Sequence, residues 1–105
     1  MSQSETVKLI KTTVQSFLPD ARVLLFGSRA TAQANHTSDY DVLVITPLPI
    51  PSTQKSNWNS KIHKALVKAI QAPVDLIINS EAEAKLYKDF HGHIIRYALR
   101  EGIEL

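Results

Sequence analysis

The chain has 105 residues, of which 44% are hydrophobic and 21% charged, so we expect one soluble domain spanning 1–105. Its formal net charge is only +2, and its basic residues form no long run, which argues against direct nucleic-acid binding. No stretch approaches the ~18 apolar residues of a membrane span, and the N-terminus lacks the apolar core of a signal peptide. The absence of cysteine excludes disulfides and fits a reducing compartment. We therefore expect a cytoplasmic protein that contacts no membrane.

Hydrophobic periodicity predicts helices that alternate with short strands. In chain order the predicted elements are a helix at 4–18, a strand at 22–26, one or two helical turns within 29–37, a strand at 40–46, a stiff proline-rich linker at 46–51, a helix at 53–71, a strand at 74–78 and a helical region after residue 80. Ser4 is the predicted N-cap of the first helix, and Ser80 with Glu83 predicts a capping box. Gly92 predicts a break in the last helical region.

Aromatic residues in the two later helical regions fall on apolar stripes, so we expect them to pack into the core. They are Trp58, Tyr87, Phe90 and Tyr97, and Leu86 and Ile94 keep the same period. If one of these faces were exposed to solvent, it would be a docking surface instead.

The lengths of the connections predict the topology. The link between the first two strands is short for a parallel crossover, so these strands should run antiparallel. A long helix lies between the second and third strands, which is typical of a right-handed parallel crossover. The expected fold is therefore α/β (α+β), with a small mixed sheet, room for an extra edge strand, and about four flanking helices. This topology brings Gly27-Ser28, Asp39, Asp41 and Asp75 to one edge of the sheet.

Asp39 and Asp41 are two residues apart at the start of a strand, so their side chains should point to the same face. A third carboxylate from Asp75 would repel both. A hard divalent cation such as Mg²⁺ relieves this repulsion and keeps coordination sites for water and substrate phosphate. The simpler alternative is that Asp39 caps a turn and Asp41 is solvated at the end of the strand.

Gly27-Ser28 follows the first strand, where the glycine permits close backbone approach and the serine can offer its hydroxyl and amide to a phosphate. Arg29 can add positive charge. A Gly-Ser pair on its own is usually only a turn. Its convergence with three aspartates favours a phosphate-binding role.

The stretch GSRATAQANHTSDYD, a Gly-Ser followed by ten residues and Asp-x-Asp, resembles the nucleotidyltransferase superfamily related to DNA polymerase beta. It is most similar to the minimal nucleotidyltransferase (MNT), the small antitoxin partner of HEPN-domain toxins. The resemblance implies a polymerase-beta-like core that uses ATP and Mg²⁺, with two metal ions expected. It also implies site roles: Asp39, Asp41 and Asp75 as catalytic metal ligands, and Gly27, Ser28 and Arg29 as the triphosphate-binding group. One departure is that Thr31 and Ala32 stand where relatives often have a further basic residue and a glycine.

Two hypotheses follow from these features. The first is a Mg-dependent nucleotidyltransferase, a protein adenylyltransferase that moves AMP from ATP onto a protein hydroxyl. The resemblance suggests that the acceptor is a tyrosine of a HEPN toxin. The second is a binding module that neutralises such a toxin by docking alone.

Three other interpretations carry less weight. His91 and His93 invite a metal-site interpretation, but residues at this spacing diverge on a helix and no third ligand accompanies them, so we expect exposed histidines on the last helix. His36 could reach a phosphate. An Asp-x-Asp motif also occurs in glycosyltransferases, but the chain leaves no space for their larger nucleotide-binding domain.

Overall fold

The computed structural model describes residues 2–30 and 39–105. Within these ranges the chain forms four helices, four strands and one short 3₁₀ helix. In chain order they are α1 (Gln3–Phe17), β1 (Arg22–Phe26), the 3₁₀ helix η1 (Gly27–Ala30), β2 (Tyr40–Thr46), α2 (Ser52–Ile70), β3 (Val74–Ser80), α3 (Glu81–Tyr87), α4 (Ile94–Glu101) and β4 (Ile103–Glu104). None of the helices in the described ranges is long and apolar enough to cross a membrane.

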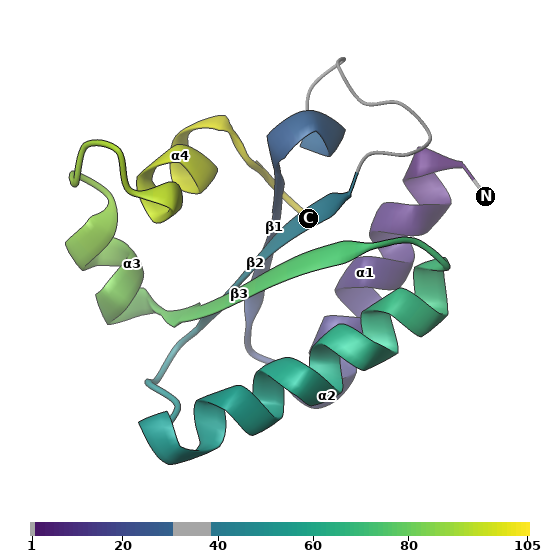
Figure 1. The fold of residues 1–105 in the computed structure, drawn as a ribbon, viewed down its shortest axis with the longest axis horizontal. Coiled ribbons are helices and arrows are strands. Elements are labelled where there is room, and N and C mark those ends of the chain that lie inside the picture. Colours follow the sequence, from purple (N-terminus) through teal and green to yellow (C-terminus); the bar gives the residue numbers. More distant parts are fainter. Residues whose placement is uncertain (1, 31–38) are drawn as a thin grey trace.

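The four strands form one mixed sheet in the order β3-β2-β1-β4 (Figure 1). β1 is antiparallel to β2, and β3 is parallel to β2 after the crossover through α2. Both directions confirm the topology predicted from the connection lengths. The short strand β4 pairs antiparallel with the other edge of β1, so the extra edge strand is also present.

Helices cover both faces of the sheet, with α1 and α2 on one side and α3 and α4 on the other (Figure 1). The central strand β2 supplies apolar side chains to both sides, which explains its unbroken apolar sequence. Val42 and Val44 pack in the cluster of α1 and α2, whereas Leu43 and Ile45 pack in that of α3 and α4. All four are 0% exposed, so β2 is the strand that the two layers of helices enclose.

The first helix begins earlier than the sequence predicted. Ser2, and not Ser4, is its N-cap, and the Ser2 hydroxyl accepts a hydrogen bond of 3.2 Å from the Glu5 amide. The Glu5 carboxylate also accepts a bond of 3.2 Å from that hydroxyl, so a favourable cap exists two residues before the predicted one. The prediction of Ser4 was therefore wrong.

The C-terminal region contains the predicted capping box and the predicted break. The Ser80 hydroxyl accepts a bond of 3.1 Å from the Glu83 amide, and the Glu83 carboxylate accepts one of 3.0 Å from the Ser80 amide. Gly92 adopts a left-handed backbone with φ +80° between α3 and α4. The two helices are therefore separate, and each begins at its own cap.

Two of the aromatic residues expected in the core are exposed instead. Phe90 is 50% exposed and Tyr97 is 48% exposed, whereas Trp58 and Tyr87 are partly buried against the core as predicted. The reason is that α3 and α4 are short and bury narrow stripes, so that other apolar side chains on these helices and on the turn between them lie uncovered among the described residues. Those uncovered side chains are Leu86, Phe90, Ile94 and Tyr97.

Candidate functional site

The predicted site residues lie at the ends of three neighbouring strands, at the same end of the sheet. Asp41 lies opposite Phe26 in the antiparallel register of β1 and β2. It also lies opposite Asp75 in the parallel register of β2 and β3. The glycine turn directly follows Phe26. Gly27, Asp41 and Asp75 are therefore neighbours at the same end of the sheet, on three adjacent segments.

Asp41 and its neighbours on β2 alternate between the two faces of the sheet. Tyr40 and Val42 are buried against the side of α1 and α2. Asp41 shares the opposite face with Leu43, whose side chain packs in the cluster of α3 and α4. Asp41 is half-buried, whereas Asp39 and Asp75 are exposed. The site thus lies on the face that α3 and α4 partly cover.

The electrostatic environment of Asp41 disfavours its charged form. Burial raises the pKa of the Asp41 carboxyl, and the charges of Asp75 and Asp39 raise it further. A side-chain hydrogen bond between Asp41 and Asp75 acts in the same direction. Among the described residues, each interaction that shifts this pKa therefore favours the neutral acid, and Asp41 is close enough to Asp75 and to Asp39 to be repelled by both.

Gly27 is required by the backbone and by the space beside it. Its φ is +72°, in the left-handed region that other residues rarely adopt. A Cβ atom at this position would overlap the Asp41 carboxylate oxygen Oδ2. The absence of a side chain at Gly27 is therefore what allows the turn and the Asp41 carboxylate to touch.

The short helix η1 carries the other two predicted phosphate-binding residues, Ser28 and Arg29, both half-buried. The Arg29 guanidinium lies over the Tyr40 ring, 4.3 Å from its centroid. The Gln3 side chain connects the two residues, because it donates a bond of 3.0 Å to the Arg29 carbonyl and accepts one of 3.3 Å from the Tyr40 hydroxyl. Arg29 is thus anchored at the base of β2 beside the site, through a contact that the sequence did not predict.

The carboxylate oxygens of Asp39, Asp41 and Asp75 are ligands that suit a hard divalent cation. Among the described residues, no three acidic or histidine side chains already stand in the arrangement of a metal site. The chemistry of the cluster nevertheless fits, because burial raises the pKa of the Asp41 carboxyl and the charges of Asp75 and Asp39 raise it further. Oxygen ligands of this kind are what Mg²⁺ prefers, and a bound cation would reverse the repulsion.

His91 and His93, which the sequence analysis considered as metal ligands, have no contact with the carboxylate cluster among the described interactions. His93 is the N-cap of α4, where Nδ1 accepts a bond of 3.1 Å from the Ile95 amide, and its ring stacks on Tyr87 at 4.2 Å. His91 is exposed in the preceding turn and not on the last helix. His93 therefore has a structural role, and the expectation of two helical histidines was wrong. His36, Thr31 and Ala32 fall outside the described residues.

Comparison with known proteins assigns the chain to a family. The sequence model of the nucleotidyltransferase domain family matches residues 7–103, and the chain therefore belongs to this family. The match includes every residue of the carboxylate cluster and of the glycine turn.

Individual relatives agree with this assignment. A Haemophilus influenzae protein called a probable protein adenylyltransferase, MntA, is 38% identical over 48 residues, which are 46% of this chain. That match covers only 42% of the relative's own length. A structure described as a toxin-antitoxin with AMP-PNP has a TM-score of 0.62 at 16% identity, covering 99% of this chain and 72% of the other. A Sulfolobus solfataricus protein assigned to the nucleotidyltransferases has a TM-score of 0.61 at 24% identity, covering 97% and 80%. The two structures show that the fold is shared.

A comparison of two glycine variants tests the contact between the turn and Asp41. Both Gly27 and Gly92 have positive φ, but a Cβ at Gly92 would meet nothing within 4 Å. Gly92→Ala should lower the free energy of unfolding by about 1 kcal/mol, the cost of a left-handed backbone. Gly27→Ala should lower it by clearly more, because it also displaces the Asp41 carboxylate. Urea denaturation measures both, and equal losses would contradict the contact.

The raised pKa of Asp41 predicts a specific pH dependence in the absence of metal ions. Between the ordinary aspartate pKa of 3.8 and the raised value, the folded state binds more protons than the unfolded state at this residue. The free energy of unfolding should therefore fall as pH rises through that window. Asp41→Asn should remove this fall and should be more stable than wild type at neutral pH. Urea denaturation with EDTA at a series of pH values measures the difference, and parallel curves for the two proteins would contradict it.

Proposed function

We propose that this chain is a Mg-dependent nucleotidyltransferase that moves AMP from ATP onto a hydroxyl of a partner protein. The partner in this proposal is a HEPN toxin, the acceptor is one of its tyrosines, and the modification neutralises the toxin. The observation that supports it most is the contact of the left-handed Gly27 turn with the Asp41 carboxylate, which lies opposite Asp75 in the sheet. A phosphate-binding turn beside clustered carboxylates is the arrangement that nucleotidyl transfer needs.

Each residue has a role in the proposal. Asp39 and Asp41 hold the metal, and Asp75 helps to hold it and accepts the proton of the acceptor hydroxyl. The backbone of Gly27 and Ser28 receives the β- and γ-phosphates, and Arg29 supplies positive charge at the same turn. Bound Mg²⁺, two ions in this proposal, would neutralise charge on the phosphates.

The transfer step follows from these positions. The acceptor oxygen forms a bond to the α-phosphorus, and the bond from that phosphorus to the pyrophosphate oxygen breaks. Pyrophosphate leaves, and the hydroxyl proton passes to Asp75. The residues mainly orient the reactants and stabilise charge, which is the usual source of rate in phosphoryl chemistry.

The toxin partner is supported by the relatives and by the surface. One relative is called a protein adenylyltransferase, and a structural neighbour is described as a toxin-antitoxin with AMP-PNP. Apolar side chains that are about half exposed on α3, α4 and the turn between them suit a protein contact. They are Leu86, Phe90, Ile94 and Tyr97.

The same exposed side chains would also serve a second function, a module that neutralises its toxin by docking without chemistry. The two functions differ in the role of the carboxylates. Docking alone requires neither Asp39 nor Asp41, whereas transfer requires both.

Labelled nucleotides separate the two functions. With Mg²⁺ and the toxin, ATP labelled at the α-phosphate should leave label on the toxin, whereas ATP labelled at the γ-phosphate should not. A kinase would give the opposite pattern. Asp39→Ala and Asp41→Ala should lower transfer by at least about 100-fold, because each removes a metal ligand. Ser28→Ala should lower it less, since the backbone amides of the turn remain.

A matched control and a binding readout complete the experiment. Asp20→Ala changes an exposed aspartate in the turn before β1, at the opposite end of that strand from the site, and should leave transfer unchanged. Co-purification with the toxin should persist in all variants. If Asp39→Ala and Asp41→Ala still neutralise the toxin fully, the enzyme proposal is wrong and the docking module is correct.

A further inference from the structure

Helix α4 borders the candidate site through one aromatic contact. Phe26, which lies opposite Asp41 in the sheet, meets Tyr97 of α4 edge to face, with ring centroids 6.3 Å apart and an interplanar angle of 78°. Helix α4 also contacts η1, the segment that begins at Gly27. Tyr97 therefore contacts the residue that pairs with Asp41 in the sheet, on the face that α3 and α4 cover.

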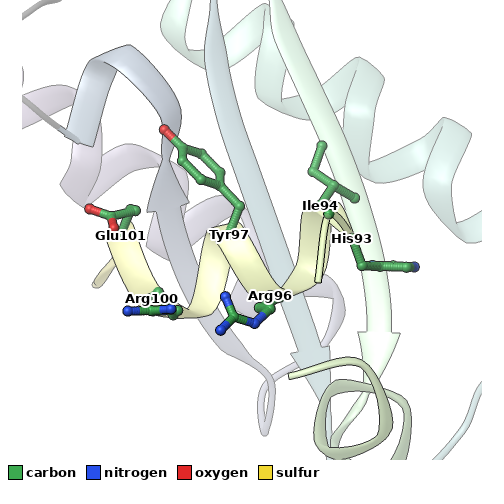
Figure 2. Close-up of a pocket in the computed structure, with 7 residues that line it drawn as sticks. His93, Ile94, Arg96, Tyr97, Arg100 and Glu101 are labelled. Atoms are coloured by element: carbon green, nitrogen blue, oxygen red, sulfur yellow. The ribbon is translucent and has the colours of Figure 1, made fainter. Parts of the chain in front are cut away.

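The aromatic ring of Tyr97 on α4 is accessible to solvent. It is 48% exposed, and Ile94, one turn earlier, is 51% exposed. Figure 2 shows both side chains on one side of α4 and Arg96 and Arg100 on the other. Ile95 and Ala98 are the buried residues of α4, and they pack into the core. Tyr97 and Ile94 are thus not needed to close the core.

These side chains help to line a hollow of about 580 Å³. This volume lies within the range of small-molecule sites, which are mostly apolar with a few polar groups at fixed positions. The described residues that line it belong to α4 and to the two positions before it: Gly92, His93, Ile94, Arg96, Tyr97, Arg100 and Glu101.

We propose that Tyr97, supported by Ile94, is the surface on which the base of the nucleotide rests. This inference depends on the proposed function, because it assumes that the Gly27 turn and the carboxylates bind the phosphates and metal of that nucleotide. A base is flat and aromatic and needs a partner that the charged end of the site does not offer. Tyr97 provides one beside Phe26, and stacking on an aromatic side chain is how proteins commonly bind bases.

Two ligands that share phosphates but differ in the base test this proposal. Calorimetry with Mg-ATP and with Mg-tripolyphosphate measures the dissociation constant of each for the same protein. Tyr97→Ala should weaken ATP binding about tenfold, the usual effect of losing one stacking partner, and leave tripolyphosphate binding unchanged. Tyr97→Phe should bind both ligands like wild type, and Ile94→Ala should weaken ATP by less than Tyr97→Ala.

The control is Leu48→Ala, which removes a 76% exposed apolar side chain from the segment after β2 and should change neither ligand. Three results would overturn the proposal. If Tyr97→Ala binds ATP as tightly as wild type, Tyr97 holds no base and its face is left for a protein partner. If Tyr97→Ala loses both ligands equally, Tyr97 acts only by supporting Phe26. If wild type binds neither ligand, the proposed function fails and the base site fails with it.

Discussion

Repulsion between carboxylates at the end of the parallel pair β2 and β3 is the constraint on which the site depends. Asp41 lies directly opposite Asp75 in this register, and burial raises the pKa of Asp41, with the charges of Asp75 and Asp39 adding to the effect. Without a cation this arrangement costs stability, because the charged form of Asp41 is disfavoured. An arrangement of carboxylates that costs folding energy is typical of a site built for function and not for stability.

The apolar core holds these charges together against their repulsion. Val44 and Ile45 of β2 are fully buried on opposite faces, so a slip of one residue would move each of them into the opposite packing layer, where a side chain of another shape fits. The same slip would turn Asp41 towards α1 and away from Gly27. The register that buries the core therefore also fixes the position of the carboxylates, and the helix α2 fixes the parallel direction of β3. The stability of the core and the geometry of the site cannot be changed independently.

The sequence predicted the sheet well because its signals are local. The strand at 40–46 matches β2, and the connection lengths give the directions of all three main strands. Periodicity shows which residues share a face but not whether another element covers that face, so the exposure of Tyr97 could not be predicted. The contact of Arg29 with Tyr40 depends on the path of the 3₁₀ helix, which spacing does not encode. The roles of the carboxylates and of the glycine turn stay predictions.

The central claim is that the carboxylate cluster binds a divalent cation together with a nucleotide. Electron paramagnetic resonance of Mn²⁺, as a substitute for Mg²⁺, measures this directly in the presence of a non-hydrolysable ATP analogue. With wild type present, the amount of bound Mn²⁺ should exceed the amount that the ATP analogue binds in solution without protein. Asp41→Asn should lose most of this additional bound Mn²⁺. If the two proteins bind Mn²⁺ equally, or wild type binds none, the carboxylates do not form a metal site and the account is wrong.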